Sequence, residues 1–269
     1  MELFSNIKAA RPQRALPERK SEKPMKLIIN GAAGRMGAEL LRLIEADNRF
    51  ELAGAVDISY DDSEAGKYTR LDDFQGKADC IVDFSHHSAA AAVSAFAAAR
   101  RIPLVIGTTG QTAEDLSAIR EASEKVPMLI AGNMSLGIAT LVELVKTAVK
   151  MFPDADVEIV EKHHNQKLDV PSGTALMLAD AVKSVRGDSV FLVGRHENGK
   201  RSKDEIGIHS LRMGGVVGEH EVIICTGSQT LSLRHTAHNR ALFAEGALAA
   251  ARFIADKLPG LYAIQDMFK

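Results

Sequence analysis

The first half of the chain alternates short apolar runs with segments of helical periodicity. Five runs have the continuous apolar character of strands that are buried on both faces: residues 26–30, 51–56, 79–84, 103–107 and 127–132. Such strands are typical of a parallel sheet that is covered by helices. Between them, residues 37–46 place Leu40, Leu41 and Ile44 on one helical face, and the alanine-rich residues 88–101 favour a second helix. This β-α-β alternation predicts a doubly wound sheet.

The pattern changes after Asn133. Apolar residues at positions 138, 141, 142, 145, 149 and 152 follow a 3.6-residue period, which predicts a long helix over 135–152. Partial period-two alternation then predicts five more strands, at residues 156–162, 189–194, 206–213, 220–226 and 229–236. Turn residues separate these strands, so we expect an antiparallel or mixed sheet with helices on one face. Residues 238–258 are again helical in pattern.

Together these elements predict an α/β protein. A Rossmann-like doubly wound parallel sheet domain is followed by a second, α+β domain with an open mixed sheet. We expect a dinucleotide-binding domain at 25–132, a second domain at 133–238, and a C-terminal helix at 239–269 that returns to the first domain. Residues 1–24 carry three prolines and mixed charge without the apolar core of a secretory signal, so we expect a flexible extension or an upstream start codon.

Composition narrows the class of protein. The 269 residues are 46% hydrophobic and carry a formal net charge of -2, so the chain can bury a core but has no global positive field for nucleic acid or anionic membrane. No apolar run approaches the roughly 18 residues of a membrane-spanning helix. Cys80 and Cys225 show no spacing typical of a disulfide framework or a zinc site. We therefore expect a cytoplasmic protein without nucleic-acid or membrane partners and without a metal.

Three glycines mark a candidate nucleotide site. Gly31, Gly34 and Gly37 follow the first predicted strand and open the first predicted helix, where backbone N–H groups can bind a pyrophosphate. Ala33 stands where the commoner fingerprint has its second glycine, so a plain tight turn remains an alternative. Asp57, twenty residues after Gly37, ends the next strand and is placed to accept hydrogen bonds from the adenosine ribose. The glycines and Asp57 together favour a dinucleotide.

Residues 57 and 58 indicate which dinucleotide the site prefers. A carboxylate at Asp57 repels the 2′-phosphate of NADPH, and Ile58 follows it in place of an arginine that would bind that phosphate. We therefore hypothesise that NADH is preferred over NADPH. Arg35, in the glycine loop, would partly offset this preference.

Two further turns follow predicted strands at the same edge of the sheet. Ligands bind at the carboxyl ends of strands in open α/β sheets. Small and polar residues in these turns are therefore expected to line the nicotinamide end of the site, although such residues are also ordinary turn formers. They are Gly107, Thr108, Thr109, Gly132, Asn133 and Met134.

The segment EKHHNQKLDVPSGTAL, residues 161–176, concentrates protonatable and anion-binding groups. His163 and His164 follow a predicted strand, where neighbouring side chains point to opposite sides, so one can face a pocket while the other lies at its rim. A histidine is the side chain best suited to exchange a proton near neutral pH. Lys167 is a nearby cation that can bind an anion or deliver a proton.

The same segment continues into a predicted helix that begins near Ser172. Ser172, Gly173 and Thr174 present hydroxyls and backbone N–H groups ahead of this helix. Simple N-capping by Ser172 or Thr174 is one interpretation. A pocket for a carboxylate is the other, and the neighbouring cations favour it. A zinc site is a rival, but no H-x-x-x-H or cysteine pairing accompanies the two histidines.

Six stretches of the chain carry a more specific resemblance. They are GAAGRMG, DFSHHSA, IGTTG, GNMSLG, EKHHNQKLDVPSGTA and VGEHEV, in this order from Met25 to the end of the chain. The chain resembles the 4-hydroxy-tetrahydrodipicolinate reductases, also called dihydrodipicolinate reductases, of the diaminopimelate route to lysine. HHNQKLDVPSGTA is the specific motif, because the glycine loop alone is shared by many dehydrogenases.

The resemblance implies hydride transfer from NADH or NADPH to a cyclic unsaturated dicarboxylate. It implies that the second domain binds the substrate and forms a homotetramer through its open sheet. His163 would be the proton donor and Lys167 a second donor close to the substrate. The implied cofactor-binding residues are Gly31, Ala32, Ala33, Gly34, Arg35, Met36, Asp57, Gly107, Thr108, Thr109, Ala131, Gly132, Asn133 and Met134. The implied substrate-binding residues are His164, Lys167, Ser172, Gly173, Thr174 and Arg240.

Two other functions compete with this one. Another two-domain dehydrogenase of amino or keto acids would keep the glycine loop and Asp57 but would not need the histidine pair. A non-catalytic NAD-responsive sensor would need a partner surface or a DNA-binding element, and the sequence shows neither a basic recognition helix nor an additional domain. We expect a structural role for four later histidines: His209, His220, His235 and His238.

Overall fold

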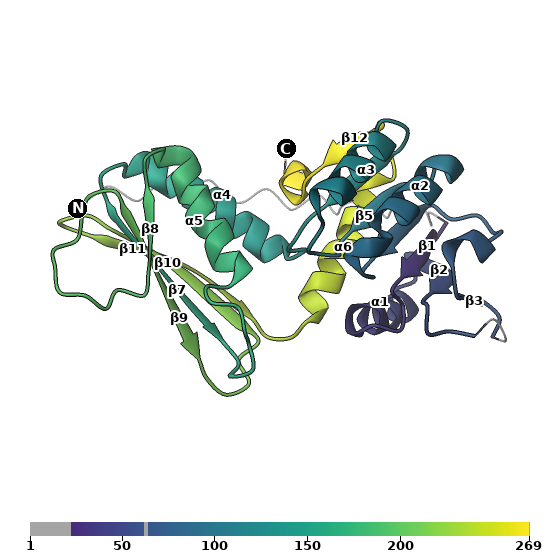
Figure 1. The fold of residues 1–269 in the computed structure, drawn as a ribbon, viewed down its shortest axis with the longest axis horizontal. Coiled ribbons are helices and arrows are strands. Elements are labelled where there is room, and N and C mark those ends of the chain that lie inside the picture. The colour runs from purple at the N-terminus through teal and green to yellow at the C-terminus, as the bar shows by residue number, and fades with distance from the viewer. Residues whose placement is uncertain (1–22, 62–63, 269) are drawn as a thin grey trace, which may run out of the picture.

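The computed structural model describes residues 23–61 and 64–268 (Figure 1). The predicted extension at 1–24 therefore lies almost wholly outside the described residues. Two sheets occupy opposite ends of the molecule, and the long helix α4 (Leu136–Met151) and the connection into α6 (Ala241–Ile254) lie between them. Within the described ranges, no helix combines the length and the apolar character that crossing a membrane requires.

The first sheet has seven strands, and all of its pairings are parallel. Its order is β12-β6-β5-β4-β1-β2-β3. The strands are β1 (Met25–Asn30), β2 (Phe50–Val56), β3 (Lys67–Tyr68), β4 (Cys80–Asp83), β5 (Leu104–Ile106), β6 (Pro127–Ile130) and β12 (Gly260–Tyr262). The chain order reverses between β1 and β4, which makes their carboxyl ends the topological switch point where ligands of such sheets bind. This confirms the predicted doubly wound fold.

Helices cover both faces of this sheet. The helix α1 (Arg35–Ala46) packs beside α6 on one face, where Leu40, Ile44 and Leu248 belong to one core cluster. On the other face, α2 (Ala90–Arg100) packs beside α3 (Ala113–Ser123), and their buried side chains belong to a second cluster. Both faces of the sheet are therefore covered by helices and excluded from solvent, which explains why its strands are continuously apolar.

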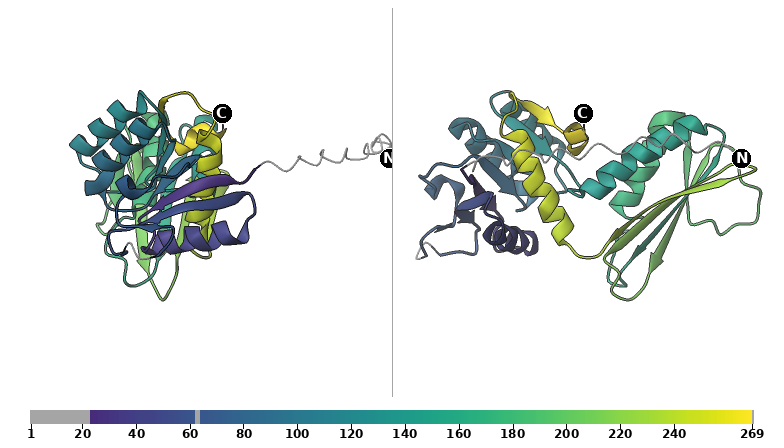
Figure 2. Two further views of the ribbon diagram at one scale, coloured as in Figure 1. Left: turned by 90° about the vertical axis from the view of Figure 1, so that its right-hand side faces the viewer. Right: turned by 180° about the vertical axis from the view of Figure 1, so that it is seen from behind.

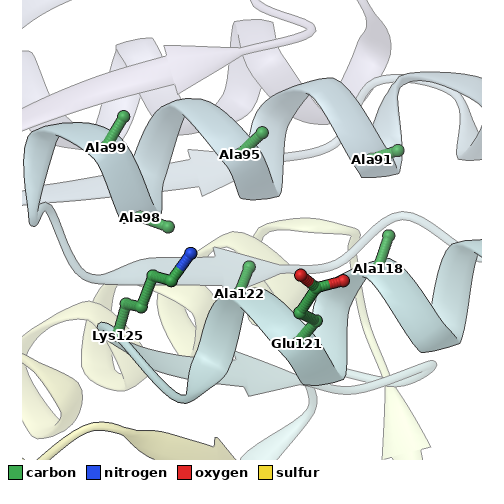
Figure 3. Close-up of a pocket in the computed structure, with 8 residues that line it drawn as sticks. All are labelled: Ala91, Ala95, Ala98, Ala99, Ala118, Glu121, Ala122 and Lys125. Carbon is green, nitrogen blue, oxygen red and sulfur yellow. The ribbon is translucent and has the colours of Figure 1, made fainter.

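A shallow groove separates α2 from α3 on the surface (Figure 3). Alanine methyl groups from both helices line it, and only Glu121 and Lys125 bring charge to it. The groove runs between these two helices. It follows from the alanine-rich sequence of α2 and carries no group suited to chemistry.

The second sheet has five strands in the order β11-β10-β7-β9-β8. The strands are β7 (Asp156–His163), β8 (Val190–Val193), β9 (Glu205–Arg212), β10 (Gly218–Cys225) and β11 (Thr230–Ala237). β7 pairs in parallel with β9 and antiparallel with β10, so the sheet is mixed as predicted. The helices α4 and α5 (Gly173–Arg186) pack on one face over a third core cluster (Figure 1).

The other face of the second sheet is open (Figure 2). Along β10, buried residues alternate strictly with half-buried ones from Gly218 to Cys225. The side chains on the open face include apolar and charged residues, among them Val160, Ile223 and Glu219. One face of this sheet is thus core and the other is accessible, which is the pattern of period two that the sequence shows.

The short elements were missed by the sequence analysis. Strands β3 and β12 have two and three residues, too few to create a periodic signal. Three single 3₁₀ turns complete the fold: η1 (Leu71–Asp73), η2 (His87–Ala89) and η3 (Ile264–Phe268). The strand β12 pairs in parallel with β6, so the end of the described chain completes the edge of the first sheet.

Candidate active site

The turn after β1 has the geometry of an anion-binding loop. Gly31 has a φ of +78°, and a Cβ atom there would lie 2.5 Å from the carbonyl oxygen of Phe84, so only glycine fits. The helix α1 begins at Arg35 with Gly34 as its N-cap, and no side chain caps it. The first N–H groups of α1 therefore have neither an intrahelical partner nor a capping side chain. They offer a positively polarised end to a phosphate group.

Asp57 lies beside this loop at the carboxyl end of β2. Its carboxylate accepts hydrogen bonds from the backbone N–H of Ala33 (3.0 Å), and from the backbone N–H and hydroxyl of Ser59 (3.0 and 2.8 Å). Burial would raise the pKa of Asp57, but these hydrogen bonds outweigh burial and lower it. Asp57 is thus a fixed carboxylate that links the glycine loop to the end of β2, while Ile58 next to it is 91% exposed.

A pocket of about 500 Å³ opens at the carboxyl ends of β1, β4, β5 and β6. Its volume is within the range of small-molecule sites. Eight predicted cofactor residues line it: Arg35, Met36, Gly107, Thr108, Thr109, Gly132, Asn133 and Met134. The sequence analysis did not assign the other five lining residues to a site: Phe84, Ser85, His86, His87 and Phe243. Met134 is only 2% exposed and belongs to the core, as does Ala131 at 9%.

A buried aspartate supports the turns that line this pocket. Asp83, at the end of β4, is 1% exposed. Its carboxylate accepts hydrogen bonds from Asn30 (2.7 Å), from the Ser85 hydroxyl (2.6 Å) and from the Thr108 hydroxyl (2.7 Å). Asp83 thereby joins three adjacent strand ends, which fixes the turns that line the pocket.

The second group of predicted residues gathers where β7 ends and α5 begins. His163 is the last residue of β7 and is 8% exposed, whereas His164 is half-buried. Ser172 is the N-cap of α5, and its hydroxyl accepts a hydrogen bond from the Ala175 N–H (3.2 Å). The capping interpretation is therefore correct for Ser172. The amides of Gly173 and Thr174 lie in the first turn of α5, where helix geometry leaves N–H groups without intrahelical partners.

Glu161 connects His163 to this turn. It is fully buried, and its carboxylate accepts a hydrogen bond from Nδ1 of His163, two from the guanidinium of Arg212 (2.9 and 2.8 Å), and one from the Ser172 N–H (3.2 Å). Burial would raise the pKa of Glu161, but the hydrogen bonds from Arg212, Ser210 and His163 lower it to about 2. Burial lowers the pKa of His163, and Glu161 opposes that effect.

His220 is a further neighbour of His163. The two rings meet edge to face with centroids 5.1 Å apart, and Nε2 of His220 lies 3.0 Å from the Ser172 hydroxyl. Burial, followed by the charge of His163, lowers the pKa of His220 to about 3, so it stays neutral near neutral pH. The sequence analysis had assigned His220 a structural role only, but the structure places it against the candidate proton donor.

Lys167 is a partly exposed residue of the same segment. Its ammonium forms an ion pair with Asp169 at 2.7 Å, and its side chain is 21% exposed. Asp169 is 57% exposed, so the pair is accessible to solvent. Within the described part of the chain, no three side chains of histidine, cysteine, aspartate or glutamate gather as metal ligands would.

One hydrogen bond joins the two groups of predicted residues. Nδ2 of Asn133 donates to the hydroxyl of Thr174 at 2.9 Å, while Oδ1 of Asn133 accepts from the Ser135 N–H at 2.8 Å. A residue at the pocket of the first sheet thus contacts the turn ahead of α5. Arg240 does not take part: it is exposed just before α6, and none of the hydrogen bonds or ion pairs among the described residues connects its side chain to the 161–176 segment.

The geometry fits a nicotinamide dinucleotide. The Gly31 turn has no room for a side chain, α1 has no capping side chain, and the pocket lies at the topological switch point. The predicted glycine loop, Asp57 and the two later turns lie along this edge of the sheet.

The sequence analysis missed Asp83, Glu161, Arg212 and His220. A signal existed for Glu161, because it precedes His163 by two positions in a strand and so shares its face. It also existed for His220, which lies in the quoted VGEHEV motif. No local signal exists for Arg212, because it meets Glu161 only through the pairing of β7 with β9.

Comparison with known proteins agrees with this geometry. The family model for the N-terminal part of dihydrodipicolinate reductase matches residues 25–134, and the model for its C-terminal part matches residues 137–268. The chain is 42% identical over 247 residues to the 4-hydroxy-tetrahydrodipicolinate reductase of Caldanaerobacter subterraneus subsp. tengcongensis, covering 91% of this chain and 98% of the relative. It is 40% identical over 249 residues to that of Alkaliphilus oremlandii, covering 90% and 98%.

A solved structure shows the same fold. The dipicolinate-bound dihydrodipicolinate reductase from Paenisporosarcina sp. TG-14 superimposes with a TM-score of 0.77 at 26% identity, covering 90% of this chain and 99% of that one. A doubly wound nucleotide-binding sheet, a second mixed-sheet domain and the histidine, lysine and helix-start group are all present in this chain, and the two family models together match nearly all of the described residues. The chain belongs to the dihydrodipicolinate reductase family, and it is an oxidoreductase of lysine biosynthesis that uses a nicotinamide cofactor.

Proposed function

We propose that this chain reduces 4-hydroxy-tetrahydrodipicolinate to tetrahydrodipicolinate, with loss of the 4-hydroxyl group as water, at the group formed by His163, Lys167 and the start of α5. The relatives carry the name of this reaction. The observation that carries the proposal is the Asn133–Thr174 hydrogen bond of 2.9 Å, which puts the turn ahead of α5 next to the nucleotide pocket. Hydride donor and acceptor must lie in contact for transfer to occur.

Two anion-binding elements suit a substrate with two carboxylates. The first is the turn of Ser172, Gly173 and Thr174, whose helix N-terminus favours negative charge. The second is Lys167, which can exchange Asp169 for a substrate carboxylate. His164 and Arg240 complete the proposed substrate-binding residues, and Arg240 would have to approach from the connection that leads into α6. The backbone N–H of Ser172 donates to Glu161, and its hydroxyl contacts Ala175 and His220. Ser172 therefore helps to fix the conformation of the turn.

His163 is the proposed proton donor. The nicotinamide cofactor, when bound, supplies a hydride. Negative charge that develops on the substrate is then neutralised by a proton from Nε2 of His163, because Nδ1 is engaged by Glu161. Burial lowers the pKa of His163 and makes its protonated form a readier donor. Lys167 is the proposed second donor.

We propose the glycine loop and its neighbours as the residues that hold the cofactor. Gly31 to Met36 would bind the pyrophosphate and Asp57 the adenosine ribose, while Gly107 to Thr109 and Ala131 to Met134 would border the nicotinamide. NADH is the preferred cofactor in this proposal. Asp57 is a fixed carboxylate that repels a 2′-phosphate, and exposed Ile58 provides no positive charge beside it.

In this proposal, each of the two domains binds a different ligand. Residues 25–132 and the returning segment 239–269 would hold the dinucleotide, and residues 133–238 would hold the substrate. The open face of the second sheet, with Val160 and Ile223 accessible on it, supports assembly into a homotetramer through this face. A cytoplasmic location is part of the same proposal, since both cysteines of the chain are free.

The test is oxidation of NADH and NADPH, followed at 340 nm, with substrate generated in situ from pyruvate and aspartate semialdehyde by the condensing enzyme. We expect rapid oxidation that requires every component and a lower KM for NADH. A folded protein that binds NADH but oxidises neither nucleotide would refute the proposed substrate. A much lower KM for NADPH would refute only the proposed preference.

A further inference from the structure

Four N–H donors converge on the carboxylate of Glu161. One oxygen accepts from Nδ1 of His163 and from Arg212 (2.9 Å), and the other accepts from Arg212 (2.8 Å) and from the Ser172 N–H (3.2 Å). An ionised carboxylate has about four lone-pair positions, so all four donors are matched. A protonated carboxyl would place a fifth hydrogen against one of them. Glu161 is therefore held as a buried anion, compensated by Arg212.

This arrangement determines which nitrogen of His163 is available for proton transfer. A carboxylate cannot donate, so the hydrogen between Glu161 and Nδ1 belongs to His163. Nε2 is then the nitrogen that gains and loses the working proton. Gly218 lies next to Nε2, and a Cβ atom at this position would be 3.1 Å from it. The absence of a side chain at Gly218 leaves that side of Nε2 open.

The same carboxylate also holds the turn that precedes α5. Ser172 donates its N–H to Glu161, while its hydroxyl caps α5 and lies 3.0 Å from Nε2 of His220. The position of the Gly173 and Thr174 amides therefore depends on the same anion as the orientation of His163. One buried side chain is in contact with both the proposed proton donor and the proposed carboxylate-binding turn.

We infer that Glu161, locked in place by Arg212, is the positioning residue of the reaction: it directs the Nε2 proton of His163 to the substrate and fixes the substrate-binding turn relative to it. The inference rests on the proposed role of His163. Glu161 itself is fully buried and does not touch the substrate. Its function is to hold the donor and the turn in one geometry, so that neither can move without the other.

The other groups that face His163 fit this role. Lys167 and Arg212 are cations that disfavour protonated His163, whereas the Glu161 carboxylate favours its protonation. His220, from β10, faces the ring of His163 as a neutral side chain near neutral pH. Removing the charge of Glu161 therefore leaves His163 among two cations and an uncharged ring.

The first test is Glu161→Gln. The glutamine amide has one acceptor and two donors, so one side of the side chain must now donate toward His163 and Arg212, or toward Ser172 and Arg212. We expect kcat to fall on the order of 100-fold, while the Kd for NADH stays within about twofold, since the nucleotide pocket is on the other sheet. The high-pH limb of the kcat profile, where His163 loses its proton, is expected to move to lower pH.

A direct readout is the side-chain NMR spectrum of histidine-labelled protein, with His163 assigned by its loss in His163→Gln. In the unmodified protein we expect the hydrogen of neutral His163 on Nδ1. In Glu161→Gln we expect a lower titration midpoint of His163. The matched control is Glu158→Gln on the same strand, because Glu158 also contacts one arginine, Arg201, and one histidine, His209 at 2.8 Å. This control is expected to move the signal of His209 and not that of His163.

A second variant tests the inference if the Glu161→Gln protein does not fold because Arg212 has lost its partner. Glu161→Gln combined with Arg212→Gln removes both charges. We again expect a lower midpoint of His163, but a smaller decrease, because the loss of the Arg212 cation partly offsets the loss of Glu161. An unchanged midpoint and tautomer of His163 in a folded variant, with an unmoved pH limb, would overturn the inference. Failure of the proposed proton role is distinguishable, because His163→Gln would then keep near-normal turnover whatever Glu161→Gln does to the His163 signal.

Discussion

The chemistry of this site depends on how single side chains are held rather than on which residues are present. His163 and Lys167 are obvious from the motif, but the orientation of His163 comes from Glu161, Arg212 and Gly218. Glu161 shares a strand face with His163, so its proximity was predictable from a period of two. Arg212 lies some fifty positions away and reaches Glu161 only through strand pairing, which local sequence does not encode.

At Gly218 we predict that a single methyl group lowers catalysis. In Gly218→Ala the new Cβ would lie 3.1 Å from Nε2 of His163, so the imidazole must move by a few tenths of an ångström. We expect kcat to fall roughly tenfold with an unchanged Kd for NADH, because small misplacements of a reacting group are costly. The control is Gly215→Ala, where a Cβ would meet nothing within 4 Å. Equal kcat values in the two variants would contradict the proposed position of Nε2.

At Asp57 we predict an effect on cofactor choice. Asp57→Asn removes the charge that repels a 2′-phosphate and replaces one acceptor oxygen by a donor, which disturbs the hydrogen bonds from Ala33 and Ser59. We expect the KM for NADH to rise roughly tenfold, as the loss of a hydrogen bond to a charged group implies, and the KM for NADPH to rise less or to fall. Asp72→Asn, an exposed aspartate paired with Arg70, should change neither KM. An unaltered ratio of the two KM values would remove Asp57 from cofactor selection.

At the scale of elements, the proposed binding surfaces lie at the starts of two helices. The N-terminus of α1 faces the nucleotide pocket without a capping side chain, and the N-terminus of α5 is capped by Ser172. Both starts were predictable, because glycines or a Ser-Gly-Thr sequence precede clear helical periods. The link between them was not, since Asn133 meets Thr174 across 41 positions of sequence. The short strands β3 and β12 also escaped sequence analysis for lack of length.

We predict that Ser172→Ala affects both stability and substrate binding. Loss of the cap of α5 is expected to lower the free energy of unfolding by about 1 kcal/mol, measured by chemical denaturation. The KM for the dicarboxylate substrate should rise as well, because Ser172 also contacts His220 and the turn loses a fixed point. Ser135→Ala removes the corresponding cap of α4, where Ser135 accepts from the Ile138 N–H at 3.1 Å. If both variants lose the same stability and raise the substrate KM equally, Ser172 acts as a cap only.

At the scale of the whole molecule, the proposal assigns cofactor binding to the first sheet and substrate binding to the second. The doubly wound sheet and the mixed sheet were both predictable, because continuous apolar strands and alternating strands have different patterns. The buried polar group of Glu161, His163 and His220 gives the second domain a dependence on pH. Glu161 and His220 keep their charge states in the folded protein over a range of pH in which the unfolded chain titrates.

We predict that the protein loses stability in acid in two steps. The folded pKa of His220 is lowered from 6.5 to about 3, so stability is lost as pH falls below 6.5, where only the unfolded chain gains the proton. The folded pKa of Glu161 is lowered from 4.5 to about 2, so a further loss begins near pH 4.5. Denaturant titrations at several pH values measure both. The difference in unfolding free energy between the unmodified protein and His220→Gln should narrow as pH falls from 6.5; a constant difference would mean that His220 titrates normally in the folded state.

The central claim is that His163 delivers the proton that completes hydride transfer. The measurement that tests it most directly is kcat for His163→Gln in the coupled assay, together with the Kd for NADH. We predict a decrease in kcat on the order of 100-fold or more with little change in Kd, as for the loss of a general acid. His196→Gln, an exposed histidine remote from the site, provides the control. Turnover of His163→Gln within a few fold of the unmodified protein would contradict the claim and leave Lys167 as the proton donor.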